Sequence, residues 1–410
     1  MRATLGIADG APRRSRLSWR RYTVMIATGL VLTGVQLLLF PRWLAPREFG
    51  IVVLAISATQ ALLQFGDLGL ARVCIDAGRP PEERACLRAD GHALTQLSAL
   101  LLVAVAFVAW GLVDRPQRAV LAAVGLAGIT AALVAADKFR AAEYEVAGDE
   151  VGSAGLNLLW SNVPKLGLIL GLVLFRQAVL LAVVSVATAL ALSRPYIGSV
   201  RRAVRVVRDV RVWMVPCLGI VSSFVLMWSD TYFLSARLGV AAAGAYEALY
   251  RILGVCTYVF LPWTSVITNR VSVGERGALV RPLILSVAST AVVLLGATLL
   301  VRGIGPSLFP RLDLPLGALP GLIAFYLLLP VSYSIGAALY VRSGAVAVAV
   351  SAGVAASVAL VGHTVFTLNG GPAEAAAVAA CALGVAVAMQ AFSYLRASRR
   401  ITARSVEPVG

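Results

Sequence analysis

The chain has 410 residues, of which 59% are hydrophobic and 14% are charged, and its mean hydropathy is +0.86. A water-soluble protein of this size needs roughly a quarter of its residues charged to cover its surface, so the composition excludes a soluble domain. The 36 basic residues outnumber the 20 acidic ones, which gives a formal net charge of +16. These charges lie in short segments between hydrophobic runs, an arrangement that indicates cytoplasmic loops beside anionic lipids rather than nucleic-acid binding.

Hydrophobic stretches long enough to cross a membrane recur along the whole chain. A spanning helix needs about 20 mostly apolar residues, because about 30 Å of hydrocarbon is crossed at 1.5 Å per residue. We therefore predict an all-α integral membrane protein of about twelve transmembrane helices. These lie at 22–40, 49–66, 91–113, 119–136, 151–175, 177–193, 212–229, 243–266, 282–301 and 375–395, with two more inside 314–373 that are separated by a tight turn at 341–344.

The distribution of basic residues predicts the orientation of these helices. With the N-terminus inside, the segments on the inner side carry 26 Arg and Lys residues and those on the outer side carry eight. This excess follows the positive-inside rule, so both termini are expected to be cytoplasmic and the protein to lie in the inner or plasma membrane of the cell. No small-residue cleavage site follows the first apolar run, so we expect an uncleaved first helix rather than a signal peptide.

The predicted helices divide the chain into two halves. An Arg-rich cytoplasmic tail, 1–21, precedes an N-terminal six-helix lobe, 22–193. A basic interlobe linker, 194–211, leads to a C-terminal six-helix lobe, 212–395, and the tail 396–410 follows. All loops are short, so we expect the function to reside within the bilayer or at its two faces.

A short string recurs at the first outer hairpin of each half. The first half contains Leu44-Ala-Pro-Arg-Glu-Phe-Gly50 and the second contains Leu238-Gly-Val-Ala-Ala-Ala-Gly244, with the same spacing from Leu to Gly. Two halves that both start inside are parallel repeats, which in transporters enclose a central cavity and rock to alternate access. The alternative is an accidental similarity within a channel or a membrane-bound enzyme.

Two regions resemble the oligosaccharide and polysaccharide flippase family. The string Phe40-Pro-Arg-Trp-Leu-Ala-Pro-Arg-Glu-Phe-Gly50, followed by Gln64-Phe-Gly-Asp-Leu-Gly-Leu70, is similar to the opening of that family. In the second half, Ser229-Asp230 and Gly244-Ala-Tyr-Glu-Ala-Leu-Tyr-Arg251 are similar to it again. The resemblance is clear around the first two helices of each half, looser over 138–175, and almost absent after 280.

The resemblance implies a function that the composition does not. Members of the family move a polyprenyl-diphosphate-linked oligosaccharide from the inner to the outer leaflet for surface polysaccharide assembly, and no cofactor is implied. Lipid II flippases in the same superfamily have fourteen helices, which disfavours that cargo here. The related drug and toxin exporters share the architecture, so a cation-coupled multidrug exporter is the main alternative. Anionic membrane lipids and other polysaccharide-assembly proteins are the expected partners.

Two basic residues, Lys165 and Arg251, fall inside predicted spans. A basic side chain at the centre of a bilayer costs roughly 2.5–3.5 kcal/mol on insertion scales, so such residues usually have a function or a partner. Asn157, Ser161 and Lys165 are four residues apart and therefore share one helix face. We predict that this face lines a translocation cavity for an anionic headgroup. The alternative is a lysine that is paired in a packed interface.

Acidic residues accompany Arg251 and suggest coupling or gating. Glu247 lies one turn before Arg251, where an ion pair is expected, and Asp230 is predicted near the outer end of the preceding helix. Asp67 stands near the inner end of the second helix. Mutual pairing of these charges for structural reasons remains the alternative in each case.

Three further residues are candidates for the outer mouth. Arg42 and Arg47 flank the first outer hairpin, where they could meet the released headgroup or lipid phosphates, and Tyr246 borders the charged cluster. For Tyr246, a place in an interfacial aromatic belt is the competing interpretation.

The sequence disfavours an enzyme. It contains no phosphate-binding Gly-x-x-x-x-Gly-Lys loop, its five cysteines are scattered, and its two histidines lie far apart, so neither ATP hydrolysis nor a metal site is predicted. A membrane glycan polymerase is the enzyme-class alternative, but such proteins usually carry a large outer loop that this chain lacks.

Overall fold

All regular structure in the described chain is helical. The computed structural model describes residues 19–65, 81–146, 150–193, 204, 210–257, 259–260, 263, 267, 271, 279–343, 345–366 and 370–404. These residues form twelve α-helices and one short 3-10 helix. The prediction of an all-α chain with about twelve helices is confirmed.

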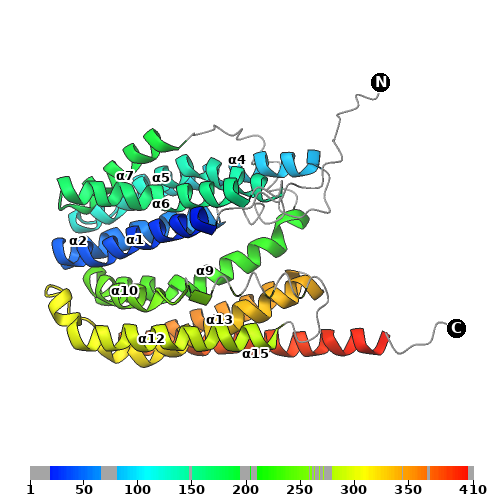
Figure 1. Cartoon of the computed structure of the whole chain (residues 1–410). Helices are drawn as coiled ribbons and strands as arrows, with labels where there is room; N and C mark the ends of the chain where they lie inside the picture. Colours follow the sequence, from blue (N-terminus) through cyan, green and yellow to red (C-terminus); the bar gives the residue numbers. More distant parts are fainter. Residues whose placement is uncertain are drawn as a thin grey trace, which may run out of the picture.

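The first six helices pack into one lobe, drawn in blue to green in Figure 1. Its centre is α5 (Arg115–Val146), which contacts four of the others. The remaining helices of this lobe are α1 (Trp19–Trp43), α2 (Pro46–Phe65), α4 (Pro81–Trp110), α6 (Glu150–Leu174) and α7 (Ala178–Leu192).

The second lobe is built from the last six helices. Buried apolar side chains such as Leu249, Leu322 and Phe325 form its core. Neighbouring pairs include α13 with α15 and α9 with α14. The helices are α9 (Val210–Leu238), α10 (Val240–Gly254), α12 (Val280–Leu308), α13 (Leu319–Ser343), α14 (Ala345–Phe366) and α15 (Pro372–Arg404), and the 3-10 turn is η1 (Leu316–Ala318).

Apolar side chains cover much of the outside of both lobes. Among the described residues, eight helices are long and apolar enough to cross a membrane, and α7 and the second half of α6 are shorter apolar segments. On α12, Val292 and Leu299 are 72% and 63% exposed. An apolar exterior of this extent is stable against lipid and not against water. The chain is a multi-pass membrane protein.

Several helices are longer than the hydrophobic pattern predicts. The helix predicted at 119–136 extends to Val146, and the one predicted at 212–229 extends to Leu238. A helix continues beyond the hydrocarbon because its backbone hydrogen bonds are satisfied internally while polar side chains reach the headgroups. Asp230 therefore lies about two turns before the end of α9 and not near that end as predicted. The predicted turn at 341–344 agrees with the end of α13 at Ser343 and the start of α14 at Ala345.

The beginning of α1, the first described helix, and the end of α15, the last one, point toward the same end of the bundle (Figure 1). An even number of crossings requires this arrangement. The cytoplasmic location of both ends stays a prediction that rests on the Arg and Lys distribution.

Close packing of α13 against α15 gives a first prediction. A Cβ atom on Gly321 would lie 2.6 Å from the carbonyl carbon of Ala376. Because that neighbour is backbone, Gly321→Ala is expected to destabilise the lobe by about 1–3 kcal/mol. Thermal unfolding of the detergent-solubilised protein measures the effect. The matched control is Gly303→Ala on α12, where an added Cβ has no neighbour within 4 Å; equal melting temperatures for the two variants would contradict the prediction.

Candidate translocation site

Lys165 lies on α6 with its charge turned into the protein. Its Nζ donates a hydrogen bond to the hydroxyl of Thr33 on α1 at 3.1 Å, and Gln36 donates to its backbone carbonyl at 3.2 Å. No carboxylate among the described residues lies within 4.0 Å of this ammonium group. Within the described part of the chain, Lys165 is therefore bonded to a neutral oxygen, and its charge is not compensated at contact distance.

A small cavity in the first lobe adjoins this lysine. Residues of α2, α5, α6 and α7 form its wall, and most of them are apolar. Among the described residues that line it, Lys165 provides the only formal charge. The polar remainder consists of Thr59, Gln60, Thr130 and Ser185. A cation beside a partly polar cavity can attract an anionic group.

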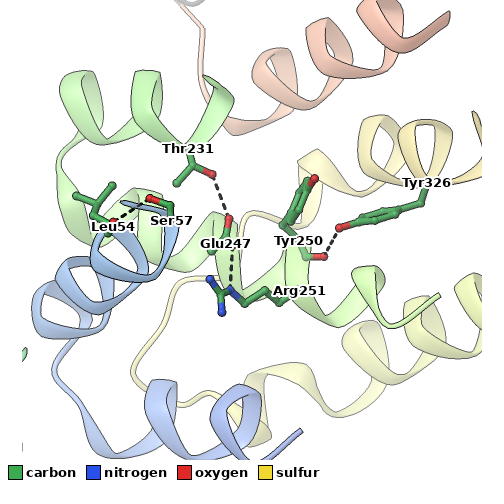
Figure 2. Close-up of polar contacts among 7 residues, drawn as sticks. All are labelled: Leu54, Ser57, Thr231, Glu247, Tyr250, Arg251 and Tyr326. Atoms are coloured by element: carbon green, nitrogen blue, oxygen red, sulfur yellow. Dashed lines mark hydrogen bonds and ion pairs between the residues drawn. The ribbon is translucent and has the colours of Figure 1, made fainter. Parts of the chain in front are cut away.

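Arg251 on α10 is paired within the second lobe. Its Nε donates to Glu247 Oε1 at 2.9 Å, which confirms the predicted ion pair one turn apart (Figure 2). The second carboxylate oxygen, Oε2, accepts a hydrogen bond from the Thr231 hydroxyl at 3.1 Å. The Glu247 side chain is 1% exposed and that of Arg251 is 20% exposed. The carboxylate is thus buried and held on both sides, while the guanidinium remains accessible.

Asp230 and Tyr246 extend this network. The Tyr246 hydroxyl donates to Asp230 Oδ2 at 2.6 Å, and the Thr231 backbone N–H donates to Oδ1 at 2.7 Å. Tyr246 was expected at the outer mouth or in an aromatic belt, but its side chain is completely buried. It is oriented inward because its hydroxyl satisfies a buried carboxylate, which would otherwise carry a large desolvation cost.

Lys165 and Arg251, the two cations within the predicted spans, belong to different lobes. The charge of Arg251 in the second lobe acts on Lys165 in the first through a Coulomb interaction between the lobes. Figure 2 shows the Arg251 guanidinium extending from α10 toward the blue helices of the first lobe. Like charges repel, so this arrangement is unfavourable on its own and becomes favourable when an anion lies between them.

The lobes also touch directly, where α2 and α10 begin. A Cβ on Gly50 would lie 2.0 Å from the carbonyl oxygen of Val240, and one on Gly244 would lie 3.0 Å from the Gly50 Cα. We call these three residues the glycine seam. It lies at the end of the bundle opposite the described chain ends (Figure 1). The two glycines of the sequence repeat are therefore in contact with each other.

Apolar and polar contacts adjoin the glycine seam. Phe40, Leu44 and Phe49 of the first lobe share one buried cluster with Ala245 and Ala248 of α10. Deeper in the bundle, the hydroxyls of Ser57 on α2 and Tyr232 on α9 lie 2.8 Å apart. Since the Ser57 hydroxyl donates to the Leu54 carbonyl, Tyr232 is the donor in this bond between the lobes. The structure is thus closed between the lobes at this end.

No protein-family model and no curated protein matches the chain. Its structure is similar to that of the lipid II flippase MurJ in an inward closed conformation, with a TM-score of 0.65, 14% identity, and coverage of 92% of this chain and 89% of that one. An outward-facing MATE multidrug-resistance transporter matches with a TM-score of 0.56, 15% identity, and 96% and 97% coverage. The chain has the fold of the MOP superfamily. A further transporter with this fold, from Pyrococcus furiosus, matches with a TM-score of 0.55, 15% identity, and 94% and 95% coverage.

Some predicted site residues are not placed by this MOP-fold structure. Asp67 lies outside the described residues, and so do the side chains of Asn157 and Ser161, although both belong to α6. Arg42 and Arg47 are exposed near the glycine seam, where the outer mouth was predicted. The polar face of α6 is therefore represented by Lys165 alone.

Other residues in the MOP-fold site were not predicted. Thr33 and Thr231 bind the side chains of Lys165 and Glu247, and Tyr232 joins the lobes. The only sequence signal for Thr231 is its place beside Asp230. Thr33 and Tyr232 act across long sequence separations, which no local pattern contains.

Proposed function

We propose that this protein is a flippase of the plasma membrane. It moves a polyprenyl-diphosphate-linked oligosaccharide from the inner to the outer leaflet by alternating access, for surface polysaccharide assembly. The proposal rests on a pair of cations within the bundle, Lys165 from the first lobe and Arg251 from the second, with the Lys165 ammonium bonded to a hydroxyl and, among the described residues, not to a carboxylate. The superfamily fold and the family-like strings at 40–50 and 244–251 support it.

The charge of the cargo explains the need for these cations. A diphosphate loses hydration when it enters the bundle, and fixed positive groups replace part of that hydration. Lys165 acts as a point charge and Arg251 as a planar donor. Asn157 and Ser161 are assigned to the same translocation face. Arg42 and Arg47 are assigned to the outer mouth, where the released headgroup and the anionic lipids meet the protein.

A vesicle assay tests the proposal. The purified protein is reconstituted with a fluorescent polyprenyl-diphosphate disaccharide, and a membrane-impermeant quencher reports which leaflet holds the lipid. We expect protein-dependent movement of this lipid, but not of a polyprenyl lipid with a neutral headgroup. Failure to move the diphosphate lipid would reject the proposal. Deletion of the gene is expected to cause cytoplasmic accumulation of the lipid-linked glycan.

The buried carboxylates support a second candidate function. Asp230 and Glu247 are 1% exposed, and a drug exporter for cationic compounds requires acidic groups within its path. The same vesicles loaded with a cationic dye test this function. Ion-driven dye efflux without lipid movement would favour the exporter over the flippase.

Asp230 is assigned to ion coupling within either function. No cationic side chain of the described residues lies within 4.0 Å of this buried carboxylate. Its hydrogen bonds from Tyr246 and Thr231 leave the charge of this carboxylate without a counter-ion, so taking up a proton or a metal cation stabilises it.

Asp230→Asn should therefore remove the stimulation of transport by an imposed proton or sodium gradient. Transport without a gradient is expected to fall less than about threefold, because Asn can still accept the Tyr246 hydrogen bond. Initial rates with and without each gradient provide the measurement, and Ser223→Ala on an exposed face of α9 is the control. A variant that keeps its full gradient stimulation would assign coupling elsewhere.

A further inference from the structure

The Arg251 guanidinium is held through one of its three nitrogens. Nε donates to Glu247, and neither Nη group makes a hydrogen bond to a described residue. In Figure 2 the Nη groups lie at the tip of the side chain, beyond the contact with Glu247. A guanidinium bound in this way cannot rotate freely about its long axis, so its two terminal amino groups keep a fixed direction.

Glu247 is itself fixed by a buried chain of hydrogen bonds. One of its oxygens accepts from the Thr231 hydroxyl, and the Thr231 backbone N–H donates to Asp230, which also accepts from Tyr246. These residues come from adjoining stretches of α9 and α10 and are almost completely buried. The carboxylate therefore has one orientation in which both of its oxygens are satisfied, and that orientation sets the direction of Arg251.

We propose that Glu247 is a positioning residue that aims the two Nη groups of Arg251 at a pair of oxygens on one phosphoryl group of the cargo. This inference rests on the proposed function and adds the geometry of recognition. Two parallel N–H···O bonds to one phosphoryl group are the strongest arrangement that an arginine offers. Lys165 supplies charge from the other lobe without this directional requirement.

Replacement of Glu247 has two effects on anion affinity, one through its charge and one through positioning, and these are opposite in direction. Its negative charge lies beside the proposed anion site, so Coulomb interaction alone predicts that removing the charge tightens anion binding. Positioning predicts that removing the oxygen that accepts from Nε weakens binding. Glu247→Ala and Glu247→Gln both remove the charge, but only the Gln variant keeps an oxygen acceptor. The comparison of these two variants therefore isolates positioning.

Inorganic pyrophosphate is the probe, and its dissociation constant for the purified full-length protein is measured by calorimetry. We expect E247A to bind pyrophosphate about tenfold more weakly than E247Q, the magnitude of one charge-assisted hydrogen bond. In the Arg251→Met background the difference between the two variants should vanish, because no guanidinium remains to be positioned. A purely structural role for Glu247 would instead preserve the difference in that background.

Other outcomes of these binding measurements distinguish failure of the positioning role from failure of the proposed function. Equal affinities of E247A and E247Q, with weakened binding by Lys165→Met, would overturn the positioning role and leave the proposed function intact. Absence of pyrophosphate binding by the wild-type protein would overturn both. If E247A does not fold, Thr231→Val replaces it, since this change removes the hydroxyl that fixes Glu247 at nearly constant volume. Thr231→Val should then bind more weakly than wild type, and unchanged affinity would overturn the positioning role.

Discussion

Replacement of Lys165 by methionine is expected to reduce transport of the diphosphate-linked lipid at least about 30-fold, since loss of one partner from a desolvated charge pair costs roughly 2–5 kcal/mol. Methionine keeps most of the length and volume of the side chain, so the change isolates the charge. Arg251→Met should have an effect of similar size. Initial rates of lipid movement in reconstituted vesicles provide the measurement.

The control for this pair is Arg302→Met. Arg302 is exposed on α12, so its replacement removes one positive charge from the chain without touching the space between the lobes. Its transport rate should stay within about twofold of wild type, as expected for an exposed charge. If Lys165→Met, Arg251→Met and Arg302→Met all transported the lipid at the wild-type rate, the two intramembrane cations would have no part in translocation.

A double variant tests whether the two cations act on one group. When two residues bind the same phosphoryl or diphosphate group, their losses do not add, because the second cation no longer has a bound partner. The double variant, Lys165→Met with Arg251→Met, should therefore transport the lipid faster than expected if the fold-reductions of the two single variants were multiplied. Strictly multiplicative losses would place the two residues at independent steps.

The helices of this fold were predictable because a bilayer imposes one strong condition on sequence. Each span needs a charge-poor stretch of about 20 residues, and such stretches are visible without any tertiary information. Helix ends were less accurate, as the extension of α9 past Asp230 shows. Hydrophobic residues are required only within the hydrocarbon region, whereas the backbone hydrogen bonds can continue the helix beyond the headgroups.

The charged pair in the site was predictable for a similar local reason. Glu247 and Arg251 are one turn apart, so a single helix brings them together. The bond from Tyr246 to Asp230 joins two helices, and the bond from Lys165 to Thr33 joins residues far apart in the chain. Lone hydroxyls on apolar helices carry no signal that identifies their partner. The contact between Gly50 and Gly244 shows the same limit, since the repeat identified both glycines but not their meeting.

The contact between the lobes at the glycine seam predicts a strong effect of an added side chain there. In the structure the lobes are closed at the glycine seam, and a Cβ on Gly50 would overlap the Val240 carbonyl oxygen at 2.0 Å. Gly50→Ala should therefore destabilise the closed arrangement by about 1–3 kcal/mol, or roughly 5-fold to 150-fold in the ratio of closed to open molecules. Under alternating access, a bundle that cannot close at this end retains an open path there, so lipid transport should fall with the closed population.

The measurement is a distance between spin labels on exposed loop residues of the two lobes. Gln177 and Asp313 are suitable positions, placed in a variant whose five native cysteines are replaced by alanine. Gly50→Ala should move the distance distribution toward longer values. Gly244→Ala should do so less, because its nearest contacts are 3.0 Å, and Gly296→Ala on α12 should not, since an added Cβ there has no neighbour within 4 Å. This order follows from the two contact distances and from the open space at Gly296. Identical spin-label distance distributions for Gly50→Ala and Gly296→Ala would mean that the glycine seam accommodates the added Cβ without separation of the lobes. Other contacts would then control closure.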